Sequence, residues 1–250
     1  MHRSRPFVTT FALDTATPDP ALAIVDGDDV VAETWLPRIP GGGRRMLEAA
    51  HELFGEAGVT PRDLDDIVVG LGPGGFTGIR IGIATALGLG QALAIPVHGA
   101  STLEALALGI ALGDGSGEAA GDVPGAPARG EDTLVIPVID ARRGQVFAAA
   151  YRVSPTGDFQ EVVAPAAWDP DALAMALAPI GACAVAGDGA DLVPLPPEAR
   201  RAHALADRIS PVRLVQRVRA RAGRPVAPEY LRLPDAEENR LRRLREEAPA

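Results

Sequence analysis

Lysine is absent from the 250-residue sequence, and cysteine, tryptophan and tyrosine are rare, with one, two and two copies. Without lysine, the chain can neither form a Schiff base nor supply the phosphate-binding lysine of a Walker-type loop. Its single cysteine, Cys183, allows no internal disulfide, which suits the cytosol, and its apolar neighbours indicate a packing role. The sequence contains no uninterrupted apolar run of about 18 residues and no apolar leader with a cleavage site. We therefore expect a cytoplasmic protein without a membrane span.

Histidine is also scarce, and the spacing of the histidines argues against a metal site. The four are His2, His51, His98 and His203, and no two of them have metal-ligand spacing. A His-x-x-x-His pair that began at His98 would place its second ligand at Thr102, and a hydroxyl does not replace an imidazole there. The spacing indicates no Ser-His-Asp or Cys-His arrangement either. We predict no catalytic residue, no metal and no cofactor.

The charge of the chain is unevenly distributed. The formal net charge is −9, but residues 1–198 carry 11 arginines and 26 acids, whereas residues 199–250 carry 13 arginines and 7 acids. An acidic body argues against a protein that grips nucleic acid by itself. The basic end is either an ordinary solvated helix or a source of phosphate contacts inside a complex. We expect any contact with RNA to be at most indirect.

The most distinctive stretch is a glycine-dense segment, 70–91, that reads GLGPGGFTGIRIGIATALGLGQ. A β-branched run at 66–69 predicts a buried strand before it, and a helix with one charge, Arg80, is expected over 77–93. A helix that is apolar nearly all round must be buried nearly all round, so it is either a central core helix or shared with a partner protein. Small residues recur at every fourth position and form one ridge of this helix: Gly78, Gly82, Ala86 and Gly90.

Hydrophobic patterning elsewhere predicts a duplicated two-lobe α/β fold. A strand that ends in an acid and a small turn occurs at Leu13-Asp14-Thr15 and again at Ile139-Asp140-Ala141, each time before a further strand. We expect lobes over 1–104 and 105–227, a flexible insertion at 113–132, and a C-terminal motif and charged tail over 228–250. Strands are predicted over 7–13, 21–25, 29–35, 66–69, 95–98, 133–139, 145–151 and 182–186, and helices over 44–57, 77–93, 101–112, 169–177 and 209–221.

The turns after these strands are candidate anion sites. The segment 70–75 formally fits the dinucleotide pattern GxGxxG, but no acid follows at the distance that ribose binding requires, which argues against a nicotinamide enzyme. A glycine-rich turn at a helix N-terminus can still bind an anion. The acids after the strands could hold a metal or a phosphate, or could simply close their turns. The candidate loop residues are Asp14, Thr15, Gly72, Gly74, Gly75, Asp140 and Arg142.

Five sequence blocks, in this order, closely resemble the TsaB (YeaZ) family of tRNA threonylcarbamoyladenosine biosynthesis proteins. The blocks are Leu13-Asp14-Thr15, GPGGFTGIRIGIATALGLGQAL at 72–93, PVHGASTLEALA at 96–107, VIDARRGQVFAAAY at 138–151 and PEYLR at 228–232. The resemblance covers most of residues 7–235. It implies a two-lobe fold of the actin, hsp70 and sugar-kinase (ASKHA) type, with duplicated mixed sheets flanked by helices.

The resemblance also implies a function and a set of partners. A member of this family is a non-catalytic paralogue that supports the catalytic subunit TsaD in a complex completed by the ATPase TsaE, and it can pair with a second copy of itself. The partner surface is expected on the helices at 44–57 and 77–93. The residues expected there are Met46, Leu47, Ala50, Phe54, Phe76, Thr77, Gly78, Ile79, Gly82, Ile83, Ala86, Leu87 and Gly90.

This chain departs from the family pattern at two places. Ala16 stands where the first loop usually has serine, which argues against nucleotide binding by that loop. The segment 41–45, GGGRR, replaces a common His-Ser pair at the start of the first helix. Two other classes of function stay open: a free-standing ATPase or sugar kinase that uses Asp14 and Asp140 on phosphate and magnesium, and a metal-dependent peptidase, against which the histidine spacing speaks.

Overall fold

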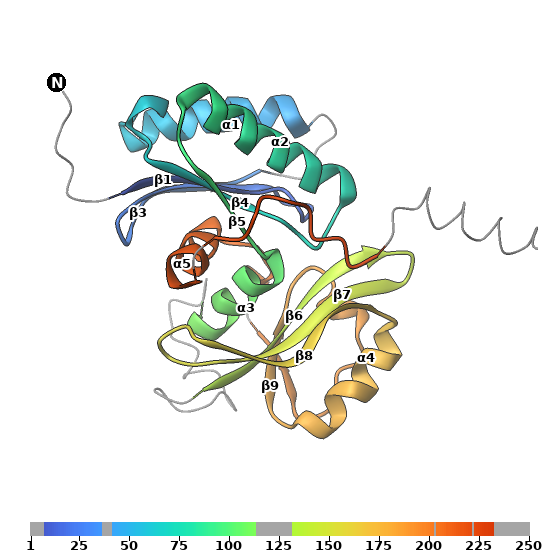
Figure 1. The fold of residues 1–250 in the computed structure, drawn as a ribbon. Coiled ribbons are helices and arrows are strands. Elements are labelled where there is room, and N and C mark those ends of the chain that lie inside the picture. Colours follow the sequence, from blue (N-terminus) through green and yellow to red (C-terminus); the bar gives the residue numbers. More distant parts are fainter. Residues whose placement is uncertain (1–7, 37–41, 114–131, 203, 222, 233–250) are drawn as a thin grey trace, which may run out of the picture.

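A computed structural model describes residues 8–36, 42–113, 132–202, 204–221 and 223–232 of the chain (Figure 1). The tail at 233–250 and nearly all of the predicted insertion at 113–132 lie outside the described residues. The first lobe contains β1 (Thr9–Asp14), β2 (Ala21–Asp26), β3 (Asp29–Trp35), α1 (Gly42–Ala57), β4 (Asp66–Gly70), α2 (Phe76–Leu93) and β5 (Val97–Ala100).

The second half of the chain begins with a helix, α3, and ends with another, α5. Between them lies the second sheet with one covering helix, α4. The bounds are α3 (Thr102–Leu112), β6 (Thr133–Arg142), β7 (Gln145–Val153), β8 (Phe159–Trp168), α4 (Pro170–Leu177), β9 (Cys183–Ala186), β10 (Ala199–Arg201) and α5 (Pro211–Arg221). Short 3-10 helices occur at Pro61–Asp63, Ala178–Ile180, Ala190–Leu192 and Ala204–Asp207.

The described residues form two five-stranded sheets with the same topology. The strand order is β3-β2-β1-β4-β5 in the first sheet and β10-β9-β6-β7-β8 in the second, which is the same order when read from β8. In both sheets the first three strands form an antiparallel meander, and the last two add in parallel on the other side of the first strand. This repeat confirms the predicted duplicated fold.

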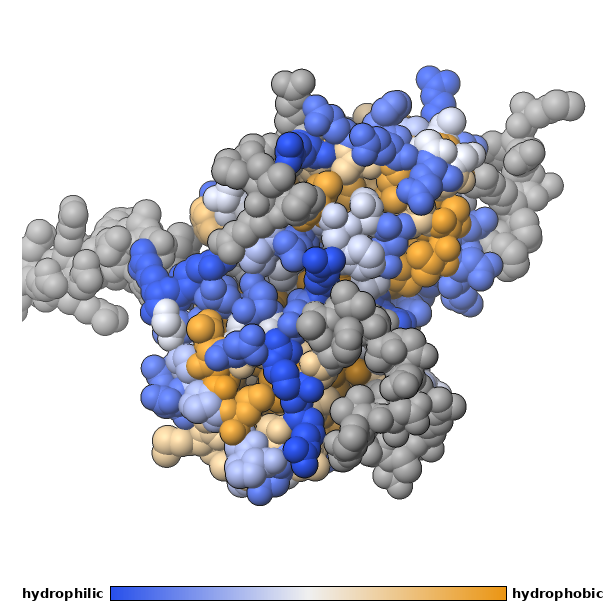
Figure 2. All heavy atoms as spheres, turned by 180° about the vertical axis from the view of Figure 1, so that it is seen from behind, coloured by the Kyte–Doolittle hydropathy of each residue, from blue (hydrophilic) through white to orange (hydrophobic). Residues whose placement is uncertain are grey.

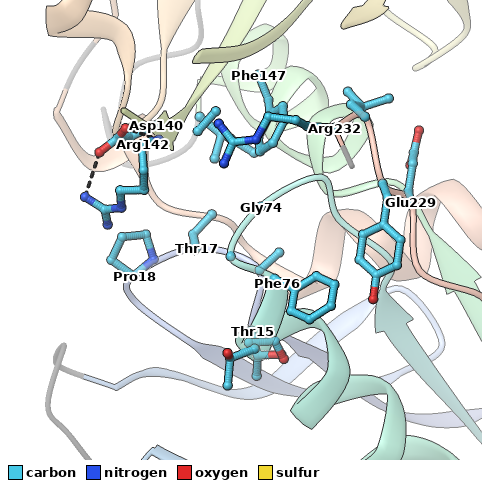
Figure 3. Close-up of a pocket in the computed structure, with 18 of the residues that line it drawn as sticks. Thr15, Thr17, Pro18, Gly74, Phe76, Asp140, Arg142, Phe147, Glu229 and Arg232 are labelled. Atoms are coloured by element: carbon cyan, nitrogen blue, oxygen red, sulfur yellow. Dashed lines mark hydrogen bonds and ion pairs between the residues drawn. The ribbon is translucent and has the colours of Figure 1, made fainter. Parts of the chain in front are cut away.

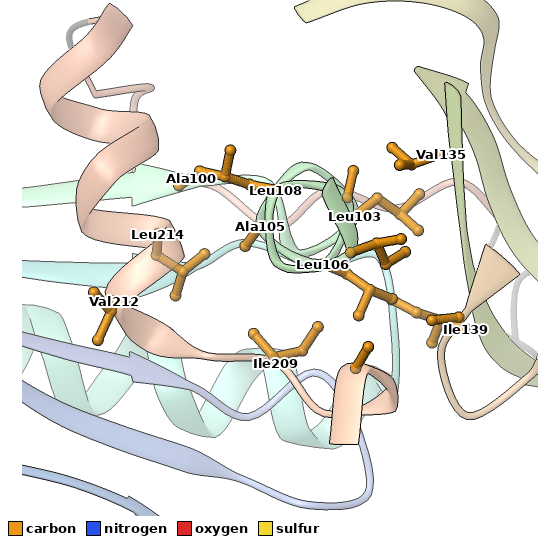
Figure 4. Packing of buried hydrophobic residues seen from close by; sticks show 14 of the residues in the cluster. Ala100, Leu103, Ala105, Leu106, Leu108, Val135, Ile139, Ile209, Val212 and Leu214 are labelled. Carbon is orange, nitrogen blue, oxygen red and sulfur yellow. The ribbon is translucent and has the colours of Figure 1, made fainter. Parts of the chain in front are cut away.

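The two sheets and their helices stack in layers (Figure 1). Helices α1 and α2 cover the outer face of the first sheet, and α4 covers the outer face of the second. The central core between the sheets is filled by α3 and α5 (Figure 4). Alternation along β1 fits these layers, because Phe11 and Leu13 join the outer core while Ala12 joins the central core.

The helix that follows the last strand of each sheet packs on the other sheet. Helix α3 follows the last strand of the first sheet but packs on β6, β7 and β9 of the second. Helix α5 follows the last strand of the second sheet but packs on β1, β2, β4 and β5 of the first. The sequence analysis assigns 105–227, which includes α5, to the second lobe; in space, α5 packs on the first sheet and on α3. Two strands were also missed, β8 and β10, and β8 is an edge strand with Pro165 in it, which an edge tolerates.

A buried ion-pair network joins the exchanged helices. Glu104 on α3 accepts hydrogen bonds from Arg217 on α5, at 3.0 and 2.8 Å, and from Arg224 at 2.6 Å. The side chain of Arg217 is only 4% exposed, and its guanidinium lies 3.9 Å from the ring centroid of Phe159 in the second sheet. Buried charges need such partners because their desolvation is costly.

Replacing Glu104 with glutamine should therefore destabilise the whole fold. The substitution removes the negative charge but leaves the buried Arg217 in place, and breaking a buried pair in this way costs roughly 3–5 kcal/mol. Urea denaturation should show this loss in the free energy of unfolding. Asp28→Asn is the matched control, because Asp28 is fully exposed and pairs with Arg219 of the same helix α5; it should leave the free energy of unfolding nearly unchanged. Equal costs for the two variants would contradict the structural role of the network.

Candidate functional site

A cavity of about 720 Å³ lies between the two lobes and is called the interlobe cleft here. Four segments and Phe147 of β7 line it. The segments are the turn after β1 (15–18), the turn before α2 with the first residues of that helix (74–80), the β6–β7 hairpin (139–143), and residues 229–232. Figure 3 shows side chains from these segments around the cavity. Its volume falls in the range of small-molecule sites in proteins.

Asp14 does not reach this cleft. Its carboxylate is completely buried and accepts hydrogen bonds from Thr102 Oγ1 at 2.7 Å and from the Ala16 backbone N–H at 2.8 Å. Burial raises the pKa of Asp14, and these hydrogen bonds oppose the rise. Of the two roles left open by the sequence, turn closure is the one observed. Asp14 is not placed to bind a metal or a phosphate in the cleft.

The glycine turn packs against the turn after β1. Gly75 N–H donates to the Ala16 carbonyl at 2.7 Å, and a Cβ at Gly74 would overlap that same carbonyl. Gly72 has a φ of +95°, which favours glycine, and it does not line the cleft. Close approach of the two turns therefore explains the glycines without a ligand. Of the seven candidate loop residues, the cleft brings together Thr15, Gly74, Gly75, Asp140 and Arg142.

The β6–β7 hairpin presents charged side chains to the cleft. Asp140 accepts a hydrogen bond from the Arg142 backbone N–H and an ion-pair contact from Arg142 Nη1, both at 2.7 Å. The Asp140 backbone N–H donates in turn to Asp188, whose pKa is raised mainly by burial. Arg142 and Arg143 have φ values of +63° and +58°, a conformation that costs a side chain about 1–2 kcal/mol.

Residues 223–232, the C-terminal strap, run from α5 along the first lobe toward the second. Arg224 pairs with Gly99 of β5 through two backbone hydrogen bonds of 3.0 and 3.2 Å. Glu229 N–H donates to the carbonyl of Leu71 at 2.7 Å, next to the glycine turn. Burial raises the pKa of Glu229, and Arg224 opposes this rise. The strap therefore fixes one wall of the cleft by backbone contacts.

The end of the strap contacts both lobes. Tyr230 stacks on Phe76 of α2 with ring centroids 5.2 Å apart, and its hydroxyl accepts a hydrogen bond from Arg80 Nε at 2.9 Å. Arg232 Nη1 donates to Gln145 Oε1 of β7 at 3.1 Å. The sequence motif PEYLR marked these residues, but patterning alone assigned them no contact. The structure adds Arg80, Glu229, Tyr230 and Arg232 to the cleft.

The ridge of small residues on α2 faces the interior of its own lobe. A Cβ at Gly78 would overlap the Thr15 carbonyl, one at Gly82 would overlap Thr15 Oγ1, and one at Gly90 would overlap Val97. This corrects the expectation that the ridge provides close approach to a partner helix. Seven of the thirteen predicted interface residues are buried in the lobe's own core, because the helices rest on the sheet with these sides: Met46, Phe54, Ile79, Gly82, Ile83, Ala86 and Gly90.

The outer faces of α1 and α2 are exposed and partly apolar. Leu47 on α1 is 61% exposed and Leu87 on α2 is 45% exposed. Ala84, Gly88 and Ala92 are exposed at spacings of four on α2, and a Cβ at Gly88 would meet nothing within 4 Å. Phe76 and Ala50 are partly exposed and Thr77 is exposed. In Figure 2 hydrophobic side chains reach the surface of the first lobe among polar ones.

Helix α2 alone among the described residues has the length and composition of a membrane-crossing helix. Its inner side is buried on the first sheet, where Ile79, Ile83 and Ala86 contact the core. It is therefore an integral helix of this fold whose outer side stays uncovered. Such an apolar, uncovered side is typical of a surface that meets another protein.

Thr102, the position of the missing second histidine, and Cys183 are both buried. Thr102 is buried at the start of α3, where its hydroxyl donates to Asp14 and accepts from Gly72 N–H at 3.1 Å. The described residues contain no group of three or more His, Cys, Asp or Glu side chains that could hold a metal ion. Burial raises the pKa of Cys183 to about 11, which keeps the thiol protonated.

Comparisons with known proteins agree on one group of relatives. A family model described as TsaD, tRNA N6-adenosine threonylcarbamoyltransferase, matches residues 43–185. The chain is 35% identical over 158 residues to the tRNA threonylcarbamoyladenosine biosynthesis protein TsaB of Bacillus subtilis, a match that covers 62% of this chain and 60% of the relative. It is 33% identical over 147 residues to TsaB of Escherichia coli, covering 58% of this chain and 56% of that protein. These matches thus span somewhat more than half the length of the two relatives.

Longer matches extend the likeness over nearly the whole chain. An uncharacterized protein of Mycobacterium tuberculosis is 36% identical over 232 residues, covering 91% of this chain and 93% of that protein. The solved structure of YeaZ from Pseudomonas aeruginosa has a TM-score of 0.67 and 27% identity, covering 90% of this chain and all of that chain. The two-lobe fold expected from the resemblance is confirmed by this likeness together with the repeated sheet topology.

Two glycines of α2 provide a matched test of the inward ridge. Gly82→Ala introduces a Cβ that overlaps Thr15 Oγ1, so it should lower the free energy of unfolding by about 1–3 kcal/mol. Gly88→Ala places its Cβ in open space and should raise the free energy of unfolding by about 0.5–1 kcal/mol through helix propensity. Denaturant titrations of both variants measure these shifts. A gain in stability from Gly82→Ala would place the ridge on the surface instead.

The buried carboxyl group of Asp14 should make stability pH-dependent. Because burial raises the folded-state pKa of Asp14 above the ordinary value of an aspartate, the stability it contributes is fully present below that ordinary value and is lost as pH rises through the folded-state pKa. We expect the free energy of unfolding of the natural chain to fall relative to that of Asp14→Asn between about pH 4 and pH 7. Urea titrations of both proteins at the two pH values test this. A difference that does not change with pH would show that Asp14 titrates normally.

Proposed function

This chain belongs to the TsaB (YeaZ) branch of the family described by the TsaD model, and on that premise we propose that it serves tRNA threonylcarbamoyladenosine biosynthesis as a non-catalytic partner subunit. Its partner is a TsaD-type catalytic subunit, which it stabilises and activates by direct contact. A TsaE-type ATPase completes the larger assembly, a second copy of this chain can take the partner's place on the same helices, and any tRNA contact is indirect. The complex works in the cytoplasm.

The exposed outer side of α2 is the observation that carries this proposal. A helix that lacks a polar face is costly to leave in water, yet Leu87 and its neighbours are uncovered in the isolated chain. Gly88 has open space around it, so this glycine lowers the stability of the helix without allowing closer packing inside the lobe. A partner helix that packs closely at Gly88 would cover the exposed apolar side chains and use the space that the glycine leaves. The partner surface is accordingly Leu47 on α1 and Ala84, Leu87, Gly88 and Gln91 on α2.

The side chains of the described chain support a non-catalytic role. Asp14, at the end of β1, is hydrogen-bonded to Thr102, and Asp140, near the end of β6, is paired with Arg142. Cys183 is buried and protonated, and His98 lies on β5 without a second histidine nearby in the metal-ligand pattern. On this proposal the chain contributes surface and shape, and the reacting groups belong to its partner.

Replacing Gly88 with leucine should abolish partner binding without unfolding the chain. The new side chain fills the open space over α2, so it blocks close approach by another helix, while the loss of a helical glycine favours the folded monomer. We expect the affinity for the TsaD-type protein of the same organism to fall at least about tenfold, equivalent to about 1.4 kcal/mol. Co-purification, size exclusion and a tRNA threonylcarbamoylation assay with both proteins measure the effect.

Met175→Glu is the control for this experiment. Met175 is 78% exposed on α4 in the second lobe, so the control removes an exposed apolar side chain far along the chain from α2. It should leave binding and threonylcarbamoylation unchanged. If Gly88→Leu binds normally while Met175→Glu does not, the partner surface lies on the second lobe. If the natural chain neither binds the TsaD-type protein nor affects its activity, the proposed function fails.

A further inference from the structure

Arg80 is the single charged residue of α2, and it lies on the exposed side of that helix. Residues four apart on a helix lie one above the other, so Arg80 continues the outer row that Ala84, Gly88 and Ala92 form. All four residues are exposed, whereas the inner side of α2 packs on the first sheet. A protein that covers Ala84 and Gly88 therefore comes within one helical turn of Arg80.

Two aromatic side chains hold the guanidinium group of Arg80 in place. Its Cζ atom lies 3.7 Å from the ring centroid of Phe76, one turn earlier on the same helix, and its Nε–H donates to the Tyr230 hydroxyl at 2.9 Å. Tyr230 in turn stacks on Phe76. An exposed arginine that pairs with an acid normally loses rotamer freedom on pairing. The contacts with Phe76 and Tyr230 already restrict Arg80, which lowers the entropic cost of binding.

The contacts that hold Arg80 do not use its two terminal nitrogens. Within the described part of the chain, neither Nη atom donates to a protein acceptor or pairs with an acid. Glu229, which precedes Tyr230, pairs instead with Arg224 at 3.6 Å, and its carboxylate points away from Phe76 in Figure 3. A guanidinium group binds a carboxylate through two parallel hydrogen bonds. The terminal nitrogens of Arg80 are oriented for such a contact, and the acid must come from another molecule.

We propose that Arg80 anchors the partner surface by binding a carboxylate side chain of the TsaD-type subunit, and that Tyr230 of the strap is its positioning residue. This inference rests on the proposed function, which supplies the partner. The rest of the outer row is alanine and glycine, so it contributes packing alone. One oriented charge beside such a row fixes the register of the partner along α2. A lone guanidinium group suits a single carboxylate, whereas binding to nucleic acid takes several positive charges.

Arg80→Gln tests the anchor in the full-length chain, by calorimetric titration with the TsaD-type protein of the same organism. The affinity should fall about tenfold at low salt, because the carboxylate of the partner loses its paired charge. Added salt should weaken binding of the natural chain more than binding of Arg80→Gln, since salt screens the ion pair. Arg152→Gln is the matched control. It makes the same charge change at an exposed arginine of β7 and should bind as the natural chain does.

Tyr230→Phe tests the positioning role of the strap. This variant keeps the ring that stacks on Phe76 but removes the hydroxyl that accepts from Arg80. It should weaken binding about threefold in the natural chain and leave the affinity of the Arg80→Gln variant unchanged, because the hydroxyl acts through Arg80. An equal loss in both backgrounds would overturn this role and show that Tyr230 acts independently of Arg80.

The outcomes separate this inference from the proposed function. If the natural chain does not bind the TsaD-type protein, both fail. If the natural chain binds and Arg80→Gln binds equally well at every salt concentration, the anchor is overturned while the proposed function stands. A loss of self-association in Arg80→Gln with unchanged affinity for the TsaD-type protein would place the carboxylate on a second copy of this chain. Binding of tRNA by the isolated chain that is lost in Arg80→Gln would assign the guanidinium group to a phosphate and overturn the proposal.

Discussion

The exchange of α3 and α5 between the lobes is the constraint on which the rest of the structure depends. Each helix leaves the last strand of one sheet and fills the inner face of the other, so neither sheet has a complete core without both halves of the chain. Glu104 and Arg217 tie the two helices together at a buried point between the sheets. A cleft between lobes joined in this way has a defined width. The strap follows α5 along the chain, so the position of α5 determines where the strap begins.

The two sides of helix α2 have different surroundings: the inner side packs in the first lobe, and the outer side is exposed. Its inner side, with Gly78 and Gly82, brings the helix close to the turn after β1, and that contact holds the glycine turn at the edge of the cleft. Its outer side, with Leu87 and Gly88, is left in solvent. Phe76 and Arg80 at its beginning contact Tyr230 of the strap. A partner bound to the outer side would therefore rest on the same rigid helix that shapes one wall of the cleft.

Local patterning predicted the duplicated two-lobe fold, although it missed β8 and β10, and it did not give the direction of α2. Strand ends, the meander, the duplicated acids and the glycine turn were all readable from local patterning, and five of the seven loop candidates do line the cleft. The direction of α2 was not readable, because α2 carries two stripes of small residues at the same spacing: Gly78, Gly82, Ala86 and Gly90 on one side, and Ala84, Gly88 and Ala92 on the other. Periodicity reveals that such stripes exist. Only the packing on β1 and β5 decides which of them faces inward.

Contacts between distant parts of the chain were equally out of reach of local patterning. The strap meets β5 at Gly99 and the glycine turn at Leu71, more than a hundred residues earlier, and the partner of Asp14 is Thr102. Sequence spacing identifies Thr102 only as the position where the second histidine of a His-x-x-x-His pair is missing. Its hydroxyl instead seals Asp14, because the start of α3 lies directly against the end of β1.

The two acids that end the first strand of each sheet show how a duplicated fold can diverge in chemistry. Asp14 and Asp140 occupy similar places, at the end of β1 and two residues before the end of β6. In the first lobe a threonine hydroxyl and a backbone N–H remove the acid from solvent, so its negative charge is disfavoured. In the second lobe an arginine at positive φ folds back on the acid and brings a positive charge to the cleft. In both lobes the carboxylate of this acid is therefore bound by protein groups, but by a neutral hydroxyl in one and by a positive charge in the other.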